Sequence, residues 1–203
     1  MKGLRIICLA IACVFWLSLD SFSQDEAAKP KYKNGDSWLF SVKEGGSTGS
    51  STKLLNGTYE VSMVDGKVKT AAVNGSQKED LEPRPSVLLS LLTFSPNLDF
   101  PLTVGKQWSR EYKATYVGSN KQVSRKITYE VKGVEQVTTQ AGTFHAVKLE
   151  SDDRSGPRDY WVTTYWYSPE TKSIVKSVFD SSAGGQVTGL QREIELIKFT
   201  PAP

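Results

Sequence analysis

The sequence predicts an all-β protein, folded as a single antiparallel meander that forms a β-sandwich or a curved half-barrel. From about residue 36 onward, short runs alternate apolar and polar side chains, which is the period of a half-buried strand. Glycine, aspartate and asparagine turns separate these runs about every ten residues. This pattern is typical of antiparallel sheets, because short turns can connect neighbouring strands directly.

The first part of this domain contains three predicted strands, which cover residues 36–42, 57–64 and 67–73. Asp65-Gly66 is a preferred dipeptide of tight hairpin turns, so the second and third strands are expected to form a β-hairpin. Asn74-Gly75 makes the next turn. The stretch GGSTGSST at 45–52 lacks the Gly-Lys-Ser/Thr ending of a phosphate-binding loop, and it is interpreted as a hairpin loop.

Residues 86–94, SVLLSLLTF, are the one stretch with helical character. They fit a short helix that covers the sheet or a buried strand equally well. After Phe100 the pattern contains only strands and turns. The predicted strands cover residues 123–131, 143–150, 160–167, 173–180 and 189–199, with turns at 140–142 and 152–157. No repeat or linker divides the chain.

The first residues have the organisation of a secretory signal peptide. Lys2 and Arg5 precede an apolar run, and Ser21-Phe22-Ser23 provides the small residues of a cleavage site. We therefore expect a signal peptide at 1–23, a flexible leader at 24–35 and a single β domain at 36–203. No integral membrane span is expected after cleavage. Export to the periplasm is the expected localisation, with secretion beyond the cell as the alternative.

Both cysteines, Cys8 and Cys13, lie inside the apolar run of the signal peptide. Neither follows that run directly, so a lipid anchor is not expected, and the mature chain has no thiol for disulfides or thiolate-bound metal. The net charge of +3 comes from lysines and arginines scattered among acids. This distribution argues against nucleic acid as a partner, and we expect no cofactor and no metal.

Three motifs in the C-terminal half occur in a fixed order: PLTVGKQW at 101–108, AGTFHA at 141–146 and WYSPETKSIVK at 166–176. In this order they resemble a group of uncharacterised exported bacterial β-rich proteins of unknown function, with kinship to the half-barrels of periplasmic lipoprotein carriers. The resemblance covers the chain from Phe100 onward. It implies a β-rich envelope protein and supplies no catalytic residues.

Candidate catalytic residues are few. His145 is the only histidine and lies in a predicted strand without a nearby partner, so it is interpreted as structural. The acids at 150–153 are interpreted as an acidic hairpin tip. Glu130 and Glu150 could form a carboxylate pair for glycoside hydrolysis, although their spacing does not select them. We therefore expect a protein that is not an enzyme.

The strand DYWVTTYWYS at 159–168 carries aromatic side chains on both of its faces. Tyr160, Val162, Thr164 and Trp166 share one face, and Trp161, Thr163, Tyr165 and Tyr167 share the other. Either the sheet is covered on both sides, or one face binds a ligand. If one face is exposed, Trp161, Tyr165 and Tyr167 are the expected ligand-binding residues, because Val162 and Trp166 alternate as a core face would.

The sequence thus predicts an exported non-enzymatic protein of the bacterial envelope. It would act as a binding or assembly module for an apolar small molecule, a lipid or another envelope protein. A carbohydrate-binding module that uses exposed aromatic side chains is one alternative, and a carboxylate-based hydrolase is another.

Overall fold

The computed structural model describes residues 26–45, 56–81, 98–115, 122–156, 159–183 and 186–203. Every regular element in these segments is a β-strand, and all paired strands are antiparallel. The prediction of an all-β antiparallel fold is therefore confirmed. The signal peptide at 1–23, most of the loop at 45–52 and the stretch 86–94 lie outside the described residues.

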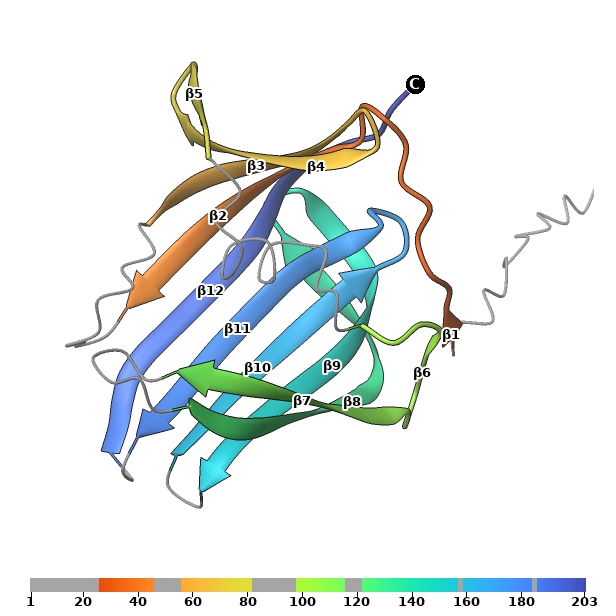
Figure 1. Cartoon of the computed structure of the whole chain (residues 1–203). Coiled ribbons are helices and arrows are strands. Elements are labelled where there is room, and N and C mark those ends of the chain that lie inside the picture. Colours follow the sequence, from red (N-terminus) through yellow and green to blue (C-terminus); the bar gives the residue numbers. More distant parts are fainter. Residues whose placement is uncertain (1–25, 46–55, 82–97, 116–121, 157–158, 184–185) are drawn as a thin grey trace, which may run out of the picture.

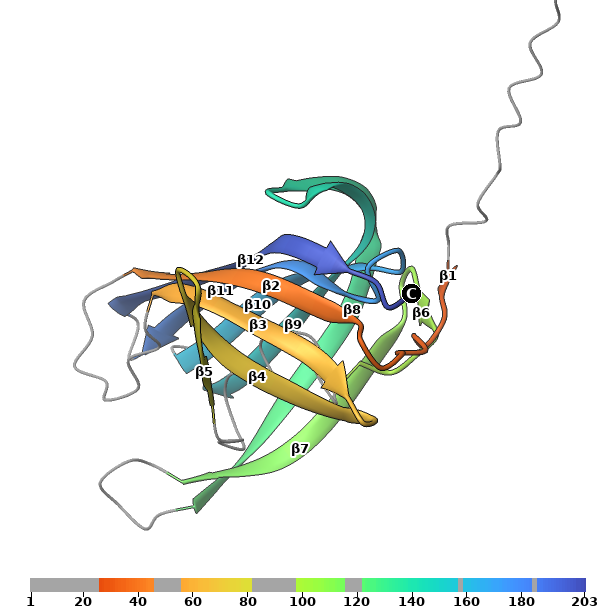
Figure 2. The same ribbon diagram turned by 90° about the horizontal axis from the view of Figure 1, so that it is seen from above.

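Ten strands form one open sheet in the order β5-β4-β3-β2-β12-β11-β10-β9-β8-β7. Their bounds in chain order are β2 Ser37–Gly45, β3 Gly57–Val64, β4 Lys67–Asn74, β5 Gln77–Asp80, β7 Gln107–Thr115, β8 Gln122–Thr139, β9 Gly142–Gly156, β10 Asp159–Ser168, β11 Ser173–Ala183 and β12 Gln186–Thr200. Figures 1 and 2 show that the sheet is strongly curved, with β3 to β5 and β7 to β8 turning toward the same side. The sheet does not close, so the architecture is a half-barrel.

The connectivity is a meander in two runs. Strands β2 to β5 are sequential neighbours, as are β7 to β12, and the two runs join where β2 pairs with β12. A separate two-stranded sheet pairs β1 (Glu26–Ala27) with β6 (Leu102–Thr103). Ala27 of the predicted leader is only 2% exposed. No helix in the described segments is long and apolar enough to cross a membrane.

The predicted turns have the backbone geometry that their residues favour. Asp65 and Gly66 both have positive φ, at 52° and 71°, as a type I′ hairpin turn requires.

The prediction of a turn at 152–157 is wrong, because β9 continues to Gly156 and pairs Asp153 with Ile127 of β8. Acidic residues remain in the strand there because the buried Asp153 forms an ion pair with Arg125.

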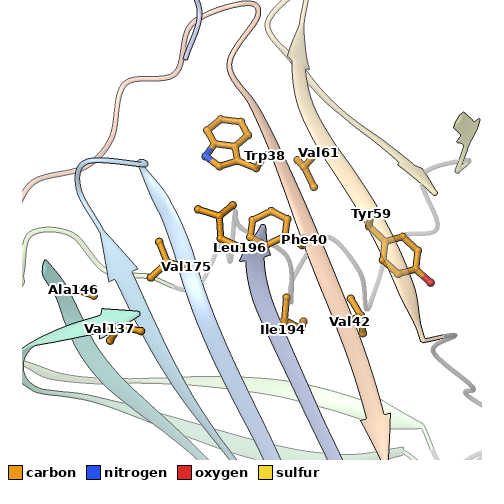
Figure 3. Close-up of a cluster of buried hydrophobic side chains, with 10 residues drawn as sticks. All are labelled: Trp38, Phe40, Val42, Tyr59, Val61, Val137, Ala146, Val175, Ile194 and Leu196. Atoms are coloured by element: carbon orange, nitrogen blue, oxygen red, sulfur yellow. The ribbon is translucent and has the colours of Figure 1, made fainter. Parts of the chain in front are cut away.

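Two clusters of buried side chains stabilise the curved sheet. The first core cluster, shown in Figure 3, consists of Trp38, Phe40, Val42, Tyr59, Val61, Val137, Ala146, Val175, Ile194 and Leu196. The second core cluster consists of Ala27, Leu102, Val131, Val147, Leu149, Tyr165, Tyr167 and Ile174. Burial of these apolar side chains is the main favourable contribution to the folding of the sheet.

The end of the β8–β9 hairpin folds back toward β12 (Figure 2). The backbone amide of Gln140 donates to Glu195 Oε1 at 2.7 Å, and the amide of Ala141 donates to the carbonyl of Leu196 at 3.3 Å. Val137 and Ala146 of this hairpin join the first core cluster. The hairpin therefore covers part of the sheet, including one side of β10.

Candidate functional site

The structure divides the aromatic residues of β10 between the core and the surface. Tyr165 and Tyr167 are 8% and 2% exposed and belong to the second core cluster, so the expectation that they lie on an exposed face is wrong. Tyr165 lies opposite Leu149, and Tyr167 opposite Val147, which places both tyrosines on the buried face. Burial raises the pKa of Tyr167 above its ordinary value.

Trp166 points to the other side of the same strand and is half-buried. It packs against the first core cluster under the folded-back hairpin, and its indole Nε1 donates to Glu135 Oε1 at 2.6 Å. At this end of β10 the sheet is therefore covered on both sides. This explains why aromatic side chains alternate on both faces of the strand.

Trp161, at the other end of β10, is 42% exposed. It lies directly opposite Asp153 of β9, and Tyr112 of β7 lies directly opposite Arg125 of β8. These four residues come from four adjacent strands, and we call them the Trp161 patch. The guanidinium carbon of Arg125 lies 4.0 Å from the centre of the Trp161 ring, which is the distance of a close cation–π contact.

A buried ion pair holds the Trp161 patch together. Arg125 Nε donates to Asp153 Oδ1 at 2.8 Å, and Tyr112 donates its hydroxyl to the other oxygen of the same carboxylate. Arg125 and Asp153 are only 6% and 3% exposed. Burial and this hydrogen bond raise the pKa of Tyr112, so its phenol remains a protonated donor at neutral pH. The exposed rings are thus attached to a fixed polar support.

Hydroxyl side chains surround this support. Ser181 lies opposite Trp161 on β11, and Ser151 and Thr163 lie opposite each other on β9 and β10, two residues along the strands. All three are at most 6% exposed. The sheet next to the Trp161 patch is therefore mixed, because Ile127 and Phe179 lie opposite Asp153 and Thr163 on the same face.

Sequence reasoning found Trp161 but missed Tyr112, Arg125 and Asp153. No short motif connects them, because 28 residues separate Arg125 from Asp153 and 41 separate Tyr112 from Asp153. The strand alternation places each side chain on a face. Only the pairing of the four strands brings the side chains together.

The candidate catalytic residues form no comparable site. His145 is exposed on β9 and has Gln136 as its neighbour, with 3.4 Å between their nitrogens. The acids at 150–153 are not a hairpin tip, since they lie within β9 and alternate between its two faces. This correction follows from the length of β9, which extends the β8–β9 pairing beyond the predicted turn.

Glu130 and Glu150 are direct neighbours on β8 and β9. Lys132 Nζ lies 2.6 Å from Glu130 and 3.5 Å from Glu150, and this hydrogen bond with Glu130 raises the pKa of Lys132. Both carboxylates line an open cavity of about 470 Å³ together with Trp108 and Lys126. They lie side by side on one sheet and share a lysine, and they do not face each other across a cleft.

No family model matches the sequence, and no curated protein matches it. The resemblance inferred from the three motifs therefore stays a prediction. Among solved structures, the chain is similar to a candidate lipoprotein of Parabacteroides distasonis, with 13% identity, a TM-score of 0.46 and coverage of 87% of this chain and 100% of that one.

Two further solved structures are similar at the same low identity. The first is the hypothetical lipoprotein YmcC of Escherichia coli, with 12% identity, a TM-score of 0.44 and coverage of 83% and 85% of the two chains. The second is an exported protein with a YmcC-like fold from Bacteroides fragilis, with 13% identity, a TM-score of 0.37 and coverage of 86% and 99%.

Proposed function

We propose that the mature chain is a non-enzymatic binding or assembly module of the bacterial envelope, and that the Trp161 patch is the surface that contacts its partner. The predicted signal peptide supports export. The arrangement of the patch supports a binding role, since aromatic and arginine side chains that are held in place contribute most of the energy in many binding surfaces.

One observation carries this proposal. Among the described residues, the exposed large hydrophobic side chains are Val104, Tyr112 and Trp161, and two of these three belong to the patch. Both rings contact the buried pair of Arg125 and Asp153, so little side-chain freedom remains to be lost on binding. Large apolar rings that stay exposed on a fixed support favour recognition over a purely structural role.

The structure gives less support to an apolar ligand along β10. Tyr165 and Tyr167, the two residues expected to line such a site, pack within the protein's own second core cluster. The exposed Trp161 patch therefore favours another envelope component as the partner over an apolar ligand along β10.

A photo-cross-linking experiment tests this function. A benzoyl-phenylalanine residue replaces Trp161 in the exported protein, and in a matched variant it replaces Val104, which is 49% exposed and lies outside the patch. We expect a cross-linked product from position 161 in intact cells, identified by mass spectrometry, and none from position 104. Equal products from both positions, or none from either, would contradict a contact surface at the patch.

Native mass spectrometry of the protein purified from the envelope separates this function from ligand carriage. A chain of bare mass is expected when the partner binds at an open surface. A non-covalent lipid adduct that disappears on denaturation would instead show an apolar carrier.

Carbohydrate binding is the second candidate function, and one observation favours it. The exposed rings of Trp161 and Tyr112 stand beside the charged side chains of Arg125 and Asp153. Sugars present an apolar ring face together with hydroxyl groups, so they match aromatic rings next to polar side chains.

A further inference from the structure

The Trp161 patch contains a guanidinium group that is only partly used. The contacts of Arg125 with Asp153 involve Nε and Nη2, the latter with the Asp153 carbonyl at 3.4 Å. Nη1 has no hydrogen-bond partner among the described residues. Nη1 is not among the buried unpartnered atoms of the described residues, so an acceptor on a bound molecule could reach it.

A second arginine lies on the same face of the sheet. Arg110 of β7 is directly opposite Ile127 of β8, which is in turn opposite Asp153 of β9. Arg110 is exposed and forms no ion pair in the part of the chain that the structure describes. Since Asp153 compensates only one of the two arginines, the described side chains Arg110, Arg125 and Asp153 together carry one positive charge, which favours an anion.

The two exposed rings lie on either side of this charge. Tyr112 is on β7 and Trp161 on β10, three strand spacings apart in the sheet. Adjacent strands lie about 4.8 Å apart, so the two strand axes are separated by roughly 14 Å, and the side chains reduce the gap between the rings. The Arg125–Asp153 pair fills the sheet between the two rings, because Tyr112 bonds to Asp153 and Arg125 stacks on Trp161, so a bound sugar would lie over this pair with a C–H face against one exposed ring.

From these features we infer that the Trp161 patch recognises an acidic saccharide, with a sugar carboxylate bound by Arg125 and Arg110 and the ring faces stacked on Trp161 or Tyr112. The inference rests on the binding role proposed above and names the chemical class of the partner. A carboxylate accepts two parallel hydrogen bonds from a guanidinium group, and the exposed Arg110 can supply both of them.

Titration of the mature protein with tetragalacturonic acid tests this inference, with tryptophan fluorescence and calorimetry as readouts. The fully methyl-esterified tetramer is the matched neutral ligand, because it keeps the sugar rings and removes the charge. We expect the acid to bind at least about tenfold more tightly than the ester, as the loss of a charge-assisted contact predicts.

Three substitutions assign the binding to the patch. Trp161→Ala and Arg110→Gln should each weaken binding of the acid by about tenfold or more. Arg125→Lys keeps the charge beside Asp153 but removes the forked guanidinium, so it should also weaken binding of the acid. Lys113→Gln is the control, because it removes a charge from the same edge strand on the opposite face.

The outcomes separate the two proposals. If the acid and the ester bind equally well and Trp161→Ala loses both, the inference that the ligand must be acidic is wrong. The Trp161 patch would still be a binding surface for saccharides. Absence of saccharide binding at millimolar concentration would overturn the saccharide inference, and a polypeptide cross-linked at position 161 would then preserve the binding role alone. Loss of acid binding in Lys113→Gln as large as in Arg110→Gln would show that bulk charge, not the patch, binds the acid.

Discussion

Asp36 links three segments that are far apart in the sequence. Its carboxylate is fully buried and accepts hydrogen bonds from the amide of Lys33 at 2.8 Å, from Lys172 Nζ at 2.8 Å and from the amide of Ala202 at 3.0 Å. The chain before β2, the β10–β11 turn and the C-terminus thus meet at one charged group. Such a group is costly to bury unless its partners stay in place.

Replacement of Asp36 by Asn should lower the free energy of unfolding by about 3 kcal/mol at neutral pH, because Lys172 then loses its buried counter-ion. The check is denaturant unfolding of the wild type and the variant. Lys132→Gln, which removes an ion pair at the surface, is the control and should leave the free energy of unfolding nearly unchanged.

The same carboxylate predicts a dependence of stability on pH. Burial raises the pKa of Asp36, but the hydrogen bonds from Ala202, Lys172 and Lys33 outweigh it and hold the pKa below its ordinary value of 3.8. Its contribution is therefore complete above the ordinary pKa and is lost as the pH falls through the folded-state pKa. Stability curves from pH 7 to pH 2 should be steeper on the acid side for the wild type than for Asp36→Asn, and parallel curves would contradict this.

Two aromatic residues of β10 should differ in what they contribute to stability. Tyr167→Ala removes a ring from the second core cluster and should cost about 3 to 5 kcal/mol. Trp161→Ala removes a ring that is 42% exposed, and it should change stability by about 1 kcal/mol or less. Thermal and urea unfolding measure both, and equal destabilisation would mean that Trp161 is a core residue and not part of a binding surface.

At the level of elements, the positive φ of Gly142 allows the tight turn at the end of the β8–β9 hairpin. Gly142 has φ of 135°, a conformation that side chains rarely adopt, and it connects the 18-residue β8 to the 15-residue β9. An irregularity in the β8–β9 register between Val131 and Gly133 accompanies the bend of this hairpin. The turn and the bend together direct the hairpin end to Glu195 and Leu196 of β12.

Substitution of Gly142 by Ala should destabilise the protein by about 1 to 3 kcal/mol, because the added Cβ is strained at this φ. Crowding is not the reason, as the nearest atom to such a Cβ would be Phe144 Cζ at 3.9 Å. Gly133→Ala is the matched control in the same hairpin, since its Cβ would meet nothing within 4 Å and its φ is not in the positive region. Urea unfolding of both variants is the measurement. If Gly142→Ala has the same free energy of unfolding as the wild type, the strain assigned to this turn is wrong.

For the whole molecule, one continuous sheet connects both core clusters, and most of its strand pairs join sequential neighbours. We expect the exported chain to begin at Gln24 and to unfold in a single cooperative transition that reducing agents do not change, because both cysteines lie in the predicted signal peptide. Intact mass and calorimetry with and without a thiol reductant check this. Two resolved transitions, or a mass that retains Cys13, would contradict it.

Much of the fold could be predicted because strand alternation and turn chemistry are local. The hairpin at Asp65-Gly66 and the extents of β3 and β10 follow from side-chain period and from dipeptides that tolerate positive φ. The end of β9 was mispredicted because acidic residues usually mark a turn. Only the pairing of Asp153 with Arg125, 28 residues earlier, makes a strand favourable there.

The sequence by itself determined that the chain is an antiparallel β protein, that its cysteines lie in a predicted signal peptide, and that β10 carries aromatic rings on both faces. Only the tertiary structure decided which of those rings are exposed. Both faces of a strand are equivalent until other elements cover them. The second core cluster buries Tyr165 and Tyr167, the folded-back hairpin covers Trp166, and Trp161 remains exposed over the buried Arg125.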